Sequence, residues 1–140
     1  MIYVIDHEDS FTYNLVHLLD NFGKTYVSNY FNIDEKKLDT CKIIVFSPGP
    51  GDPSHYPETQ KIYHKYKGVK KIIGICLGFQ QILYAEKGQI IAQKKIFHGY
   101  QSRIKVLNGS TLFKPNKTLL GGRYHSLKLK EPFYNKNLKI

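Results

Sequence analysis

The chain of 140 residues contains no tryptophan, one methionine and only two cysteines, Cys41 and Cys76. Two cysteines cannot form a disulfide framework, and their spacing matches no zinc motif. We therefore expect no bound metal ion, and no pattern in the sequence indicates a cofactor. Cys41 is predicted to be a small buried residue.

Long hydrophobic runs are also absent. No stretch reaches the roughly 20 apolar residues that cross a bilayer as a helix. The strand-like run from Met1 to Ile5 begins the sequence without the basic segment of a signal peptide. We therefore expect a cytoplasmic protein that does not contact a membrane. With 41% hydrophobic residues, residues 1–140 can bury one core and are expected to form a single domain.

Acidic residues are scarce, since 11 Asp and Glu stand against 21 Lys and Arg and give a net charge of +10. Clustered Lys and Arg would indicate nucleic-acid binding. Only Arg103 and Arg123 are arginines, however, and the lysines are scattered through nearly every expected element. Scattered lysine is typical of a solvated surface, so no nucleic-acid partner is expected.

Apolar runs alternate with segments of helical spacing through the first two thirds of the chain. Strands are expected over residues 2–5, 25–27, 42–46 and 71–75, each followed by a helical segment. This alternation predicts an α/β fold with an open, mostly parallel sheet and helices on both faces. Three short antiparallel strands are expected in the second half, over residues 90–92, 103–106 and 127–129.

Cys76 lies in the most informative stretch, Gly74-Ile75-Cys76-Leu77-Gly78, between an apolar strand and a helix-like run. A sharp strand-to-helix turn with glycines on both sides is typical of a nucleophile elbow. The helix N-terminus is expected to favour the thiolate and so to lower the pKa of Cys76. This pattern predicts a catalytic cysteine.

Two other loops follow expected strands, Asp6–Ser10 and the proline-rich and glycine-rich segment Ser47–Pro53. The carboxyl ends of parallel strands meet at one edge of a sheet, so we expect both loops to converge on Cys76. A stiff loop can present backbone N–H groups, and those of Gly51 and Leu77 are the expected oxyanion donors. The loop lacks the Gly-Lys-Ser/Thr ending of a phosphate-binding P-loop.

Five motifs together resemble the glutamine amidotransferase subunit of anthranilate synthase and para-aminobenzoate (aminodeoxychorismate) synthase. They occupy residues 6–15, 47–51, 74–78, 98–99 and 123–127 in the family's order. The resemblance implies a class I, triad-type glutaminase with a flavodoxin-like fold. It also implies a place in tryptophan or folate biosynthesis, with L-glutamine as substrate and a chorismate-using synthase subunit as partner.

The resemblance assigns roles to particular residues. Cys76 matches the nucleophile, and Gln80 matches a residue that binds the amino-acid end of glutamine. Gly49, Pro50 and Gly51 match the loop that contacts glutamine and binds the oxyanion. Ser126 and Leu127 match the segment that holds the glutamine carboxylate and amine. The loop from Asp6 to Ser10 resembles the part that faces the synthase subunit.

The chain departs from the family in two places. Phe79 stands where the family usually has a histidine that is not the catalytic base. The His-Pro-Glu motif that supplies the base and its carboxylate does not occur in residues 1–140. We therefore expect a C-terminally truncated family domain that is nearly inactive. Its uncovered apolar surface is expected to support a homodimer or to leave a marginally stable monomer.

Two other interpretations compete with the glutaminase. One is a non-catalytic remnant that keeps the partner-binding face or glutamine binding, which the missing His-Pro-Glu favours. The other is a phospho-receiver-like module, suggested by Asp6 and Asp9 near a strand end. That module has little support, because the third strand ends in Phe46-Ser47 and not in an aspartate that could be phosphorylated.

Overall fold

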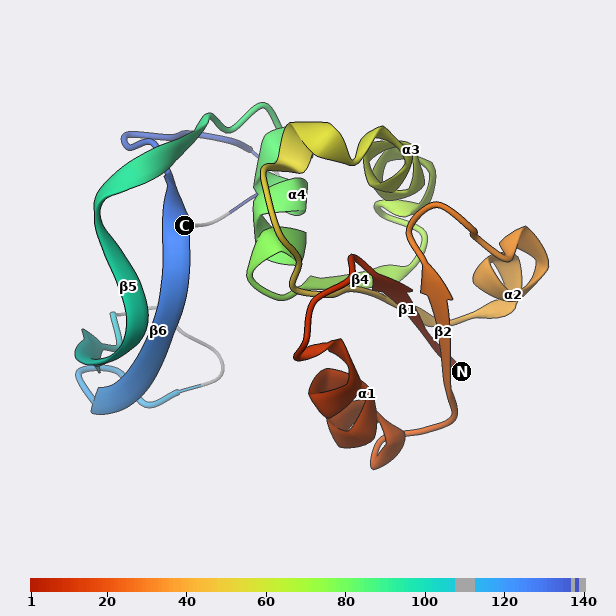
Figure 1. Cartoon of the computed structure of the whole chain (residues 1–140), viewed down its shortest axis with the longest axis horizontal. Helices are drawn as coiled ribbons and strands as arrows, with labels where there is room; N and C mark the ends of the chain where they lie inside the picture. Colours follow the sequence, from red (N-terminus) through yellow and green to blue (C-terminus); the bar gives the residue numbers. More distant parts are fainter. Residues whose placement is uncertain (108–112, 137, 139–140) are drawn as a thin grey trace. The chain divides into compact units, whose positions relative to one another are not determined.

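The computed structural model describes residues 1–107, 113–136 and 138. These residues form two compact units (Figure 1). Unit 1 comprises Met1–Ile91 and Leu129–Ile140, and unit 2 comprises Ala92–Lys128. Two compact units can belong to one domain, so the single domain over residues 1–140 stays a prediction.

Unit 1 alternates strands and helices. Its strands are β1 (Ile2–Asp6), β2 (Thr25–Asn29), β3 (Ile43–Phe46) and β4 (Lys71–Gly74). Its helices are α1 (Thr12–Asp20), α2 (Glu35–Thr40), the 3-10 turn η1 (Pro53–His55), α3 (Pro57–Tyr66) and α4 (Leu77–Ala85). The strands are all parallel and lie in the order β2-β1-β3-β4.

Helices cover both faces of this sheet. On one face, Val16 of α1 packs with Ile2, Val4 and Val45. The other face carries the larger cluster, which joins β1 and β3 to α2 and α3: Tyr3, Ile5, Leu38, Cys41, Ile44, Phe46, Ile62, Tyr63 and Tyr66. Burial on both faces explains the continuous apolar runs of β1 and β3. The predicted parallel sheet is confirmed.

Unit 2 is built on a two-stranded ribbon formed by β5 (Ile90–Lys105) and β6 (Thr118–Leu129). The ribbon is antiparallel, as expected, and near its turn the Val106 N–H donates to Lys117 O. The prediction of three short strands was wrong in number and length. Gly99, at φ +78°, introduces an irregularity without ending β5, because glycine adopts a positive φ at little cost.

The segment after β6 is held against α4 by a buried carboxylate. Glu86 accepts hydrogen bonds from the Tyr63 hydroxyl at 2.9 Å and from Asn135 Nδ2 at 3.2 Å, and its Oε1 lies 2.6 Å from Lys67 Nζ. Each contact compensates part of the cost of burying the charge. In the part of the chain that the structure describes, no helix is long and apolar enough to cross a membrane.

Candidate functional site

The turn between β4 and α4 is tight enough to require both of its glycines. A Cβ on Gly78 would lie 2.1 Å from the Phe46 carbonyl oxygen, and one on Gly74 would lie 2.4 Å from the Gly78 carbonyl oxygen. Between them, Cys76 adopts φ 53° and ψ −108°. A non-glycine residue with positive φ is strained, and such strain is concentrated at functional sites. The backbone therefore has the form of a nucleophile elbow.

Cys76 is exposed at the surface, immediately before the first residue of α4. Partial burial of the thiol raises its pKa, the hydrogen bond from the Leu77 N–H lowers it, and the nearby Asp9 carboxylate raises it. The net change is upward, so the expected lowering by the helix N-terminus was wrong. Desolvation and a like charge disfavour the thiolate more than one backbone donor favours it.

The Ser47–Pro53 loop is joined to this elbow. The Gly78 N–H donates to Ser47 O at 3.2 Å. Gly49 has no room for a side chain, since a Cβ there would lie 2.5 Å both from His7 Cβ and from Leu77 Cδ2. Segments that follow β1, β3 and β4 therefore meet at Gly49, which is the convergence expected from parallel strands.

Hydrogen bonds fix the shape of the same loop. The Tyr56 hydroxyl donates to Pro50 O at 2.8 Å, and Asp52 Oδ1 accepts from the Ser54 N–H at 2.9 Å. Gly51 adopts φ +76°, which suits glycine and strains other residues. The loop is thus rigid around the segment expected to contact glutamine. The oxyanion role of the Gly51 N–H stays a prediction.

His7 ties this loop to the rest of unit 1. Its backbone N–H donates to Ser47 Oγ at 2.9 Å, its Nδ1 lies 3.3 Å from the same oxygen, and its Nε2 lies 3.0 Å from Thr59 Oγ1. The ring packs edge-on against Tyr56 with centroids 4.9 Å apart. Burial lowers the pKa of His7 from 6.5 to about 4. His7 is therefore neutral at pH 7.

The Ser47 hydroxyl donates to Pro48 O at 2.6 Å, which leaves its oxygen free to accept from His7. A neutral His7 with its proton on Nδ1 satisfies this arrangement, with Nε2 accepting from Thr59. The ring is fully buried and its nitrogens are engaged, so His7 holds the loop in place and is unsuited to deprotonate Cys76. Sequence patterns pointed to neither Thr59 nor Tyr56, because both act through contacts distant along the chain.

The other predicted site residues lie in two different elements. Gln80 is buried in the first turns of α4, where its backbone N–H donates to Cys76 O at 3.1 Å. Ser126 and Leu127 belong to β6, within unit 2. The substrate-binding roles of Gln80, Ser126 and Leu127 stay predictions.

His125 is the first alternative base to consider, and unit 2 already uses both of its ring nitrogens. Arg123 Nε donates to His125 Nε2 at 3.1 Å, and His125 Nδ1 lies 3.1 Å from Leu127 O. The ring also stacks on Phe97, with centroids 5.8 Å apart. Because both ring nitrogens are engaged within unit 2, His125 is poorly placed to act as a general base.

Residues 3–140 match the family model described as glutamine amidotransferase class-I. The chain belongs to the class-I glutamine amidotransferase family. Its sequence is 35% identical over 136 residues to anthranilate synthase component 2 of Lactococcus lactis, covering 94% of this chain and 67% of that protein. It is also 35% identical over 134 residues to aminodeoxychorismate/anthranilate synthase component 2 of Bacillus subtilis, covering 93% and 69%.

The fold of this amidotransferase chain is similar to that of a glutamine amidotransferase from Thermotoga maritima. The TM-score is 0.71 at 14% identity, covering 92% of this chain and 61% of the other. The chain thus spans about two thirds of the length of these three proteins, and 24% of the bifunctional protein TrpGD of Thermotoga maritima.

Proposed function

We propose that the chain is the glutaminase component of an anthranilate or aminodeoxychorismate synthase. It would hydrolyse L-glutamine through a thioester on Cys76 and supply ammonia to a chorismate-using synthase subunit. The observation that carries the proposal is the strained Cys76 elbow, with the Leu77 N–H donating to the sulfur and the Ser47–Pro53 loop packed beside it.

The proposed chemistry uses the Cys76 sulfur as the attacking atom. The thiolate adds to the side-chain amide carbon of glutamine, and the carbonyl oxygen becomes an oxyanion that accepts from the N–H groups of Gly51 and Leu77. The C–N bond then breaks, the nitrogen takes a proton and leaves as ammonia, and a thioester remains. Water attacks the thioester, releasing glutamate and the free thiol.

The remaining residues would bind the substrate. Gly49 and Pro50 belong to the loop that contacts the glutamine side chain, and its rigidity pre-organises the site before substrate arrives. Gln80, Ser126 and Leu127 would hold the amino-acid end. The resemblance that assigns these roles also places the loop from Asp6 to Ser10 toward the synthase subunit.

The names of the relatives support the proposed destination of the ammonia. One relative is named for anthranilate synthase alone and another for both aminodeoxychorismate and anthranilate synthase. Anthranilate leads to tryptophan, and aminodeoxychorismate leads to folate. We propose a cytoplasmic heteromer serving one pathway or both.

Turnover by residues 1–140 alone is proposed to be at background, because they contain no His-Pro-Glu motif. In a triad enzyme, loss of the base costs up to roughly a million-fold in rate. His7 and His125 are both engaged in other contacts. The competing proposal, a non-catalytic protein that binds glutamine or a partner, therefore applies to these residues taken by themselves.

A chloroketone analogue of glutamine tests the site without requiring turnover. We expect it to alkylate Cys76 before Cys41, because Cys41 is buried and its thiol donates to Leu38 O at 3.1 Å. Mass spectrometry of tryptic peptides measures both sites, and free glutamine should slow the labelling of Cys76 alone. Equal labelling of the two cysteines in the folded protein, or no protection by glutamine, would contradict the proposed site.

Ammonia release measures whether a base is present. We expect no release above background from the 140-residue chain, with or without a synthase subunit. Turnover that the subunit stimulates, and that Cys76→Ser abolishes, would show that another residue acts as base. It would refute the proposed inactivity while supporting the glutaminase.

A further inference from the structure

The positive charge of the chain is concentrated in unit 2. Residues 92–128 contain six lysines and two arginines but no aspartate or glutamate. Because the whole chain carries +10, unit 2 contributes +8 and the rest of the chain only +2. These eight basic residues belong to one contiguous segment, and six of them lie on β5 and β6: Lys94, Lys95, Arg103, Lys105, Arg123 and Lys128. A one-signed surface of this kind favours an oppositely charged partner.

Side-chain alternation along β6 separates the two faces of the ribbon. The exposed side carries Leu120, Tyr124 and Lys128, whereas Arg123 and His125 on the opposite side are half-buried. Leu120 is 71% exposed and Tyr124 is 59% exposed. The exposed side therefore combines a cation with large apolar groups.

Strand β5 adds to the same side. The centroids of the His98 and Tyr124 rings lie 5.4 Å apart, so His98 is on the same side of the ribbon as Tyr124. Lys94 and Ile96 precede His98 at every second position of β5 and therefore point to the same side. The positive φ of Gly99 shifts the alternation of β5. Beyond it, Ile104 lies on the opposite, half-buried side of β6, because a Cβ on Gly121 would lie 2.6 Å from Ile104 Cδ1.

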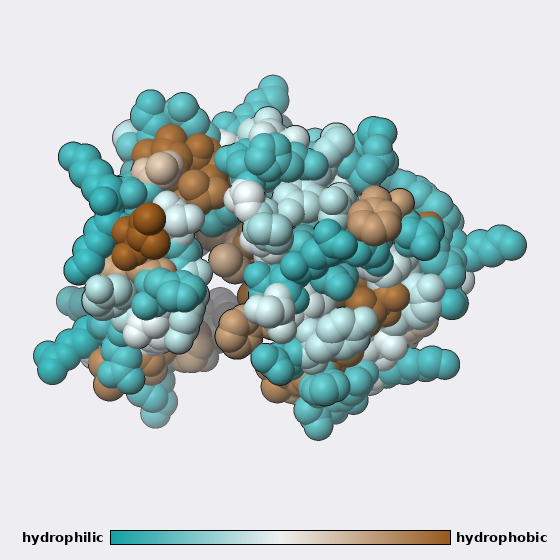
Figure 2. All heavy atoms as spheres, viewed as in Figure 1, coloured by the Kyte–Doolittle hydropathy of each residue, from teal (hydrophilic) through white to brown (hydrophobic). Residues whose placement is uncertain are grey.

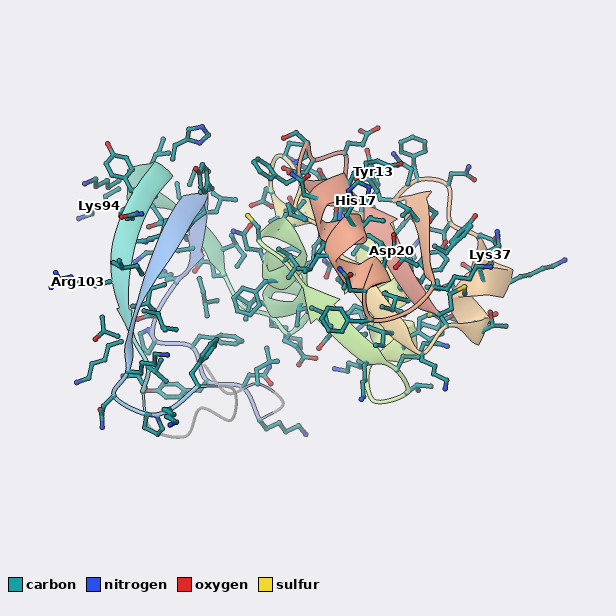
Figure 3. All side chains as sticks on the ribbon, turned by 90° about the horizontal axis from the view of Figure 1, so that it is seen from below. Tyr13, His17, Asp20, Lys37, Lys94 and Arg103 are labelled. Carbon is teal, nitrogen blue, oxygen red and sulfur yellow. The ribbon has the colours of Figure 1, made fainter. Side chains whose placement is uncertain are left out.

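Arg103 therefore points outward with Lys94, and Figure 3 shows both side chains directed away from the ribbon on one side. We call the set Lys94, Ile96, Arg103, Leu120, Tyr124 and Lys128 the ribbon face. Figure 2 shows brown apolar residues among teal ones over the part that carries β5 and β6.

We propose that the ribbon face docks onto an acidic protein surface, that of the synthase subunit which receives the ammonia. This inference rests on the proposed function. The cations of the ribbon face belong to a segment without Asp or Glu, and they would meet the partner's acidic side chains and speed association. Between them, the exposed side chains of Ile96, Leu120 and Tyr124 would supply the apolar contact that a protein interface buries at its centre.

The same ribbon is poorly suited to nucleic acid. Single-stranded binding surfaces offer several aromatic rings on which successive bases stack, whereas Tyr124 is the one Phe or Tyr among the six residues of the ribbon face. Exposed aliphatic side chains such as Ile96 and Leu120 make no favourable contact with the charged phosphate groups of a nucleic acid. Lysine also outnumbers arginine six to two in unit 2, although arginine is the residue that binds phosphate through two parallel hydrogen bonds.

A charge-matched pair of variants tests the proposal. Lys94→Glu/Arg103→Glu reverses two charges of the ribbon face, and Lys24→Glu/Lys36→Glu reverses two exposed charges of unit 1. Both change the net charge equally. Association of each 140-residue chain with the synthase subunit from the same genome is measured by surface plasmon resonance at several salt concentrations. Circular dichroism melting checks that both variants fold.

We expect the ribbon variant to associate about 10-fold more slowly at low salt and to lose most of its salt dependence. The unit 1 variant should stay within about two-fold of the parent, since Lys24 and Lys36 are not part of the ribbon face. Leu120→Ser should speed dissociation without changing the charge. Equal slowing by both double variants would overturn the docking surface while leaving the complex itself intact.

Two further outcomes would also overturn the inference. If the parent chain does not bind the synthase subunit at all, the proposed function falls and the docking surface with it. If a single-stranded oligonucleotide of 20 thymidines binds the parent chain more tightly than the subunit does at 150 mM salt, and Lys94→Glu/Arg103→Glu abolishes that binding, the ribbon is a nucleic-acid surface.

Discussion

His7 illustrates at the scale of one residue how a loop near a reactive group is held. Its neutral ring bridges Ser47 and Thr59, so the segment after β1 supports the loop after β3 and contacts α3. A charged imidazolium in the same place would lose its hydration, and it could no longer accept from Thr59. The network therefore holds only while His7 is unprotonated.

Stability should consequently depend on pH through His7. Burial lowers the pKa of His7 to about 4, whereas the unfolded chain titrates near 6.5. Between these values the unfolded state binds more protons, so stability is fully present above pH 6.5 and falls as the pH drops toward 4. The whole effect is about 3 kcal/mol, at 1.36 kcal/mol for each pKa unit.

Urea unfolding at pH 7.0 and pH 4.5 measures this loss in the parent and in two variants. His7→Asn should be less stable than the parent at pH 7.0 and should show a clearly smaller pH dependence. His17→Asn, at an exposed position of α1, should keep the parent's dependence. If all three proteins lose the same stability between the two pH values, His7 is not the titrating group.

At the scale of the element, the elbow depends on how closely α4 approaches β3. The first turn of α4 lies over the end of β3, with the Gly78 N–H donating to Ser47 O. That approach leaves no space for a Cβ on Gly78 beside the Phe46 carbonyl. The glycines of the elbow are therefore required by packing as well as by the turn.

Gly78→Ala should destabilise the protein by about 3 kcal/mol or more, because the clash is with backbone that cannot move without separating α4 from β3. Gly122→Ala is the matched control, since a Cβ there meets only Tyr124 Cε2 at 3.6 Å. We expect it to change stability by less than about 1 kcal/mol. Thermal melting compares the two, and equal stability would refute the packing requirement.

At the scale of the whole molecule, β4 lies at one edge of the described sheet. It pairs in parallel with β3, and Ile73 lies opposite Val45. Ile73 and Ile75 remain 43% and 39% exposed near this edge. An unpaired edge with apolar side chains offers backbone donors and acceptors to another strand.

We therefore propose that the 140-residue chain forms a homodimer through the β4 edge. Light scattering after size exclusion should give a mass above that of the 16.2 kDa monomer, and Ile73→Lys should shift it toward the monomer. Leu18→Lys, at an exposed position of α1, should leave the mass unchanged. A monodisperse, thermally stable parent monomer would contradict the proposal.

The sequence by itself determined the order of elements and the position of the elbow. Apolar runs and helical spacing are local patterns, so β1, β3 and the segment around Cys76 could be predicted from them. Gly74 and Gly78 also signalled the turn directly, since glycine tolerates close backbone approach. The convergence of the three loops followed from parallel topology alone.

Only the tertiary structure decided the electrostatics and the long-range contacts. The pKa of Cys76 is raised by burial and by Asp9, which is 67 positions away along the chain. The basic character of residues 92–128 is visible in the sequence, but only the pairing of β5 with β6 decided which of their side chains share one face. Such effects depend on which residues become neighbours in space, and local sequence patterns do not show this for residues that are far apart in the chain.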